Sequence, residues 1–150
     1  MNGIMKYISR IYRTTGVVYN NRLRDDGLNQ CQHPYILHIC REPGISQEKL
    51  AREICVNRSN VTRQLATMEK EGLIVRKQDE QDRRIWRVYP TERMEQLLPR
   101  ARQVMREWNE YLLEPLTQEE REILERAMEK ITARANEAAQ ETLRGKERQP

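Results

Sequence analysis

Cationic and hydrogen-bonding side chains gather between positions 46 and 87 of this 150-residue chain. From position 57 to 71, apolar residues recur at Val61, Leu65 and Met68, a spacing that predicts a helix with one buried face. The other face carries side chains that can read DNA, because arginine can donate two hydrogen bonds to guanine, and asparagine or glutamine can pair with adenine. These side chains are Asn57, Arg58, Ser59, Asn60, Thr62, Arg63, Gln64 and Thr67. The pattern predicts a helix that lies in a major groove.

Two neighbouring segments add groups that could hold the DNA backbone. Ser46 and Gln47 open the preceding predicted helix, where they could donate hydrogen bonds to a phosphate. After the DNA-reading helix, residues 73–77 and 85–89 are rich in β-branched and aromatic types and flank a polar loop, which predicts a solvent-exposed β-hairpin. Its loop offers Arg83 and Arg84 to a minor groove. The cations of the hairpin expected to contact DNA are Arg76, Lys77, Arg83, Arg84 and Arg87.

The elements that must position these groups are mostly helical. A helix, a short turn, a second helix and a hairpin form a winged helix-turn-helix module at residues 30–90. Residues 1–29 and 91–145 form amphipathic helices that lack partners within the module, so we expect them to make a helical dimerisation region. The predicted fold class is mainly α with a small β-hairpin wing (α+β), in a single protein spanning residues 1–150.

Composition narrows the possible functions. The chain is 37% hydrophobic and 33% charged, with a formal net charge of +4, and its positive excess lies in the middle and near the N-terminus. No apolar run is long enough to span a membrane and no signal peptide is evident, so we expect a cytoplasmic protein with no membrane partner. The chain is too short for a large multi-domain enzyme and contains no recognisable catalytic motif, so we expect no enzymatic activity.

Three cysteines raise the question of metal or redox chemistry. Cys31, Cys40 and Cys55 form an odd set without CxxC spacing, and their placement relative to His33 and His38 matches no standard zinc pattern. We therefore expect reduced, buried thiols and no metal or cofactor.

Four motifs together resemble the core of the MarR family of bacterial regulators. They are Gln-x-x-Leu-Ala at 47–51, Ser-x-Val-Thr-Arg at 59–63, Leu-x-x-Met-Glu-x-x-Gly-Leu-Ile at 65–74 and Asp-x-x-Asp-Arg-Arg at 79–84. The similarity is close over about residues 30–100, and the flanking helices agree in placement only.

The resemblance implies a transcriptional regulator that binds a pseudo-palindromic double-stranded DNA operator as a homodimer. It further implies a repressor released by a small-molecule effector, with Asp82 stabilising the wing by pairing with Arg84. Tyr12, His38 and Trp108 are candidates for an effector pocket between the dimer helices and the DNA-binding module. Two alternatives remain open: a DNA-binding regulator that senses redox state or metal, and a winged-helix protein-interaction module that does not bind DNA.

Overall fold

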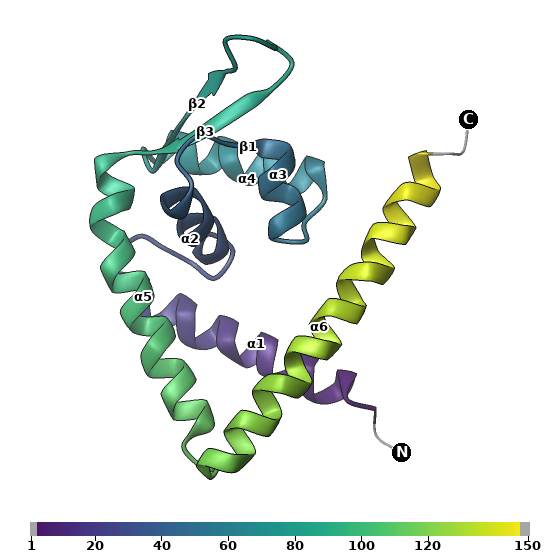
Figure 1. Ribbon diagram of the computed structural model, residues 1–150. Coiled ribbons are helices and arrows are strands. Elements are labelled where there is room, and N and C mark those ends of the chain that lie inside the picture. The colour runs from purple at the N-terminus through teal and green to yellow at the C-terminus, as the bar shows by residue number, and fades with distance from the viewer. Residues whose placement is uncertain (1–2, 148–150) are drawn as a thin grey trace. The chain divides into compact units, whose positions relative to one another are not determined.

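The computed structural model describes residues 3–147; positions 1–2 and 148–150, which the predicted regions include, lie outside it. The described chain contains six helices and one three-stranded antiparallel sheet, so the predicted fold class is confirmed (Figure 1). The helices are α1 (Met5–Arg22), α2 (His33–Arg41), α3 (Gln47–Glu53), α4 (Arg58–Lys70), α5 (Glu92–Leu113) and α6 (Gln118–Glu147). The strands are β1 (Ile45–Ser46), β2 (Ile74–Gln78) and β3 (Trp86–Pro90).

The chain divides into two compact units, the first ending at Trp108 and the second beginning at Asn109. The core of the first unit lies where α2, α3 and α4 pack beneath the sheet. The predicted inward face of α4 is confirmed, because Val61, Leu65 and Met68 are buried. Other buried side chains of this core are Ile36, Ile39, Leu50, Leu73, Ile74, Val88 and Met94.

Local capping explains where the two helices of the helix-turn-helix begin. The Ser46 hydroxyl accepts the backbone N–H of Lys49 at 3.1 Å, and the Asn57 side-chain oxygen accepts the N–H of Asn60 at 2.9 Å. Both caps satisfy a backbone donor that has no partner within its own helix. The start of α4 is therefore fixed by its own sequence, which sets the register of every side chain on its exposed face.

The predicted hairpin gains a third strand, β1, that sequence patterning did not indicate. β3 lies between β1 and β2, with Ile45 opposite Val88 on one side and Arg76 opposite Val88 on the other. Gly44 precedes β1 with a φ of +87°, and a Cβ there would lie 3.1 Å from the Tyr89 ring. A glycine at this turn thus lets the chain approach β3 without strain.

The long helix α5 continues the first unit from the sheet towards α1. Trp108 is buried, and its indole Nε1 donates to the hydroxyl of Thr15 on α1 at 2.9 Å. Arg22 and Glu107 form an ion pair of 3.0 Å between the same two helices. These contacts fix α1 against α5 within the unit.

The second unit is dominated by α6, whose start is a capping box. Glu120 accepts the backbone N–H of Thr117 at 2.8 Å, while the Thr117 hydroxyl accepts the N–H of Glu120 at 3.3 Å. Leu124, Met128 and Ile131 lie exposed at spacings of four and three, which is one face of the helix. Across residues 3–147, no helix is both long and apolar enough to cross a bilayer.

The expectation of buried thiols is wrong for Cys31 and Cys55 and is met only in part by Cys40. Cys31 and Cys55 are exposed, and Cys40 is half-buried. Cys31 precedes α2, and Cys55 adopts a positive φ of 55° in the turn between α3 and α4. Such turns leave side chains near the surface, which residue type alone could not indicate.

Candidate nucleic-acid interface

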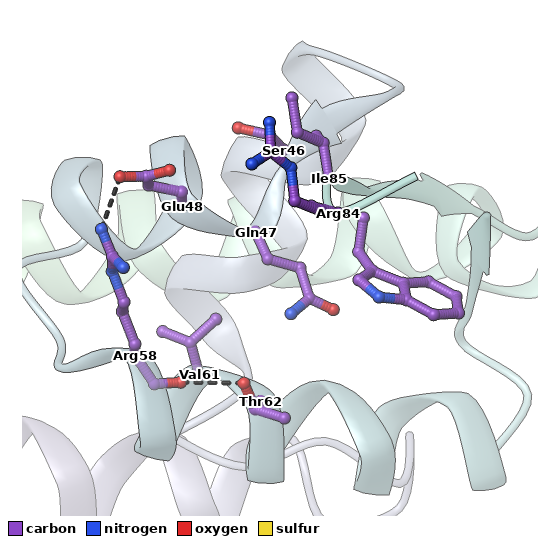
Figure 2. A pocket seen from close by; sticks show the side chains of 9 residues that line it. Ser46, Gln47, Glu48, Arg58, Val61, Thr62, Arg84 and Ile85 are labelled. Carbon is purple, nitrogen blue, oxygen red and sulfur yellow. Dashed lines mark hydrogen bonds and ion pairs between the residues drawn. The ribbon is translucent and has the colours of Figure 1, made fainter. Parts of the chain in front are cut away.

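A cleft of about 230 Å³ opens between α3, the first turns of α4 and the wing (Figure 2). α3 and the residue before it contribute Ser46, Gln47 and Glu48, α4 contributes Arg58, Val61 and Thr62, and the wing contributes Arg84, Ile85 and Trp86. The structure therefore brings together the three segments that the sequence predicted to act on one ligand.

The predicted polar face of α4 is exposed to solvent. Arg58, Ser59, Asn60, Thr62, Arg63 and Thr67 are exposed, and Gln64 is half-buried. The hydroxyls of Thr62 and Thr67 donate to the backbone carbonyls one turn earlier, at 3.0 and 3.2 Å. Their methyl groups are consequently held in defined positions on the exposed side of the helix.

Each arginine on this face has a partner that restricts its orientation. Arg58 Nη2 lies 2.6 Å from the Glu48 carboxylate, and Arg63 Nη2 donates to the side-chain oxygen of Asn60. A guanidinium has five N–H donors, so most of them stay available to a ligand after one such contact.

The wing shows the expected contact between Asp82 and Arg84. Arg84 Nε donates to one carboxylate oxygen of Asp82 at 3.0 Å and Nη2 donates to the other at 3.0 Å. These hydrogen bonds lower the pKa of Asp82 and raise the pKa of Arg84. The pair stiffens the wing loop while the Arg84 side chain remains 91% exposed.

A second wing carboxylate, Asp79, was not predicted, and it accepts hydrogen bonds from three residues, whereas Asp82 accepts them from Arg84 alone. It accepts the backbone N–H groups of Asp82 at 3.0 Å and Gln81 at 2.9 Å, and it pairs with the Arg87 guanidinium. The Asp82 N–H, the Arg87 side chain and the Gln81 N–H lower the pKa of Asp79 to about 2. The only sequence signal for this role is the first Asp of the Asp-x-x-Asp motif.

Acid should therefore loosen the wing at an unusually low pH. Because its pKa is lowered, ionised Asp79 stabilises the fold fully above its ordinary pKa of 3.8, and this contribution is lost as the pH falls through about 2. In an NMR titration, the backbone amide protons of Gln81 and Asp82 should shift with a midpoint near 2. Asp79→Asn should abolish that step. A midpoint near 3.8 in the unaltered protein would contradict the proposed role.

Two of the predicted DNA-contacting cations, Arg76 and Arg87, are held by other groups of the protein. Arg76 is only 20% exposed and donates to Glu69 through Nε at 3.1 Å and Nη2 at 2.7 Å, which lowers the pKa of Glu69. Arg87 pairs with Asp79 and also donates to the Gly44 carbonyl at 3.0 Å. These contacts tie the wing to α4 and to the turn before β1, so for both arginines the geometry favours a positioning role over direct DNA contact.

Lys77 is exposed but lies against an aromatic ring. Its ammonium is 5.4 Å from the centroid of Tyr89 on the neighbouring strand, a cation–π distance. Its predicted DNA contact stays a prediction.

The sequence profile of the MarR family matches residues 28–86. An uncharacterised HTH-type transcriptional regulator of Bacillus subtilis, YybA, is 32% identical over 131 residues, which cover 87% of each chain. The chain belongs to the MarR family. A SlyA-like transcription regulator from Listeria monocytogenes superposes with a TM-score of 0.92 at 28% identity, covering 97% of both chains. A putative MarR-family regulator of the same organism, solved in complex with 26-mer DNA, has a TM-score of 0.88 at 28% identity and covers 97% of both chains.

Sequence reasoning missed three residues that line the cleft of this MarR-family protein. Trp86 and Ile85 are 42% and 36% exposed, although both are large apolar side chains. In the sequence these two residues indicate only a β-strand, and no local pattern predicts that they lie beside α4. Glu48 was missed because acidic residues are common in the first turn of a helix, where they interact favourably with the helix dipole, so its position did not indicate a further role.

The three candidates for an effector pocket lie in different surroundings. Tyr12 on α1 is 68% exposed, whereas Trp108 is buried against α1. The Nδ1 of His38 lies 2.8 Å from Glu53 and 3.0 Å from Arg41, within a charged cluster between α2 and α3. A pocket that includes all three stays a prediction for this MarR-family protein.

Proposed function

We propose that this MarR-family transcriptional regulator is a homodimeric repressor that binds a pseudo-palindromic double-stranded DNA operator and releases it when a small-molecule effector binds. The observation that carries the proposal is the exposed polar face of α4, which is capped by Asn57 and faces the wing residue Arg84 across one cleft. A basic helix beside a basic hairpin offers contacts to base edges and to adjacent phosphates.

Three segments take separate parts in DNA binding. Arg58, Asn60 and Arg63 lie in the first turns of α4, where side chains reach base edges. Ser46 and Gln47 face the same cleft and hold a phosphate, and Arg83 and Arg84 reach the neighbouring minor groove. The relative that was solved with a 26-mer DNA supports this use of the fold.

Unpartnered apolar side chains in both units support the homodimer. α1 exposes Tyr7, Ile11 and Tyr12, which are 56%, 49% and 68% accessible. On α6, Leu124 and Met128 are 40% and 36% accessible. Apolar stripes of this extent on long helices are typical of surfaces that bury one another on association.

Repression relieved by an effector requires a mechanical connection to α4, and the first unit contains one. Gln32 is 1% exposed and donates to the Glu71 carboxylate at the end of α4 at 2.5 Å. Arg93 of α5 donates to the Glu71 carbonyl at 2.7 Å. A ligand that shifts α5 or the residues just before α2 would thus change the position of α4, and with it the population of dimers able to bind DNA.

A salt titration of DNA binding tests the proposal, and the fluorescence of Trp86 can be used to follow the binding. The test duplex is the DNA upstream of the chain's own gene. A dimer that makes about six to ten phosphate contacts should lose about a thousandfold or more in affinity between ~50 and ~200 mM salt. Binding should change the fluorescence of Trp86, which is 42% exposed, but not that of buried Trp108.

Trp86→Phe supplies the control, because it should remove the fluorescence change while leaving a salt-dependent shift in an electrophoretic assay. The absence of binding to every duplex at low salt would contradict the proposal and favour a protein-interaction module.

A further inference from the structure

An acidic side chain stands among the groups that we assign to DNA. Glu48, in the first turn of α3, lines the cleft between Gln47 and the start of α4 (Figure 2). Its Oε1 is 2.6 Å from Nη2 of Arg58 and 3.5 Å from Nη1 of Arg52. The side chain is 56% exposed, so its carboxylate faces the solvent that DNA would displace.

Electrostatic attraction alone would not favour a carboxylate here. Sequence-independent affinity for DNA comes from the neutralisation of phosphates by lysine and arginine, and a nearby negative charge reduces it. The helix dipole favours an acid in the first turn of α3, but that effect does not require contact with Arg58. The 2.6 Å ion pair therefore needs a reason of its own.

We propose that Glu48 is a positioning residue that gives Arg58 its sequence specificity, an inference that rests on the proposed function. The carboxylate compensates the charge of Arg58, so that this arginine contributes little to attraction by any DNA. It also fixes the plane of the guanidinium, so that the donors left free point in one direction. Bidentate recognition of a guanine edge depends on such a fixed direction.

Another arginine of the α4 face and one of the wing follow this arrangement. Arg63 is held by the Asn60 side chain, and Arg84 is held by both oxygens of Asp82. In the part of the chain that the structure describes, the side chain of Arg83 has no such partner, which suits a cation that follows phosphates. Arg58 differs because its partner comes from a different helix, and the pair therefore also depends on how α3 packs against α4.

The test compares the DNA affinity of Glu48→Gln with that of the unaltered dimer on two duplexes. The first duplex is selected from a randomised library with the unaltered protein. The second is a scrambled duplex of the same composition. The substitution keeps the side chain's size and removes its charge. Affinity for the scrambled duplex should rise about two- to fivefold per subunit, the range of an exposed ion pair. Affinity for the selected duplex should rise less or fall, so that the ratio of the two decreases.

Asp25→Asn is the matched control, because it makes the same change in net charge at an exposed position in the turn after α1. It should leave the affinity ratio unchanged. Thermal denaturation of both variants verifies that any change in the ratio does not come from unfolding.

A double-mutant cycle separates positioning of Arg58 from direct repulsion of DNA. If Glu48 acts through Arg58, Glu48→Gln should not change the affinity ratio when Arg58 is already alanine. An equal gain on both duplexes that persists without Arg58 would overturn the inference, as would an unchanged ratio with Arg58 present. Failure of the unaltered protein to bind any DNA would instead overturn the proposed function and this inference together.

Discussion

Replacing Arg63 with alanine should cost about 1–3 kcal/mol of DNA-binding free energy per half-site and relax the base preference at one operator position. Arg63 lies in the second turn of α4 on its exposed face, and its Nη2 donates to Asn60. The Asn60 N–H is in turn bound by the Asn57 cap at 2.9 Å. This chain of contacts starts at the cap and fixes the position from which Arg63 reaches a base edge.

Binding measured against a panel of duplexes with single base changes checks this expectation. The unaltered protein should discriminate at the position that Arg63 reads, and Arg63→Ala should bind all four base pairs there about equally. Arg106→Ala provides a control, because Arg106 is an exposed arginine of α5 outside the cleft. An equal loss of affinity on every duplex would show that Arg63 contacts a phosphate instead.

Met128→Glu should dissociate the proposed dimer and thereby abolish operator binding. Met128 is 36% exposed at the centre of the apolar stripe that also contains Leu124 and Ile131. If a partner covers this stripe, the new carboxylate becomes buried without a counter-charge in both subunits. We expect association to weaken about a hundredfold or more.

Sedimentation velocity at micromolar concentration measures the association of the subunits directly. Affinity for DNA should fall when the subunits dissociate, because a single half-site is bound far more weakly than two linked half-sites. Arg126→Ala makes the same one-unit change in charge nearly opposite Met128 on α6, since successive helical residues are ~100° apart. It should leave the dimer intact. A Met128→Glu protein that stays dimeric would place the subunit interface elsewhere.

Patterns over a few residues were sufficient to predict the elements that carry the site. The spacing of Val61, Leu65 and Met68 predicted both the existence of α4 and its exposed face, because helical geometry relates residues three and four apart. Ser46 predicted the start of α3, because a cap bonds a backbone group only three residues away. The Asp82–Arg84 contact was implied by the resemblance to the MarR family, through a motif confined to the wing loop.

Contacts between distant segments were not predictable in this way. Strand β1 has two residues and forms only because the turn at Gly44 brings it against β3. Arg76 and Arg87 were predicted to face DNA, yet their guanidinium groups are held by Glu69 and Asp79, seven and eight residues away. No local pattern distinguishes an arginine that pairs with the protein from one that stays free.

The cationic and hydrogen-bonding side chains between positions 46 and 87 thus fall into two groups: those whose placement follows from local sequence and those whose placement follows from tertiary packing. The sequence alone determined that a capped helix would present Asn60 and Arg63 on one face, since capping and periodicity act within a few residues. Only the tertiary structure decided which cations are held by groups farther along the chain, as Arg58, Arg76 and Arg87 are. It is the packing of α3 against α4 that brings Glu48 to within 2.6 Å of Arg58, ten residues along the chain.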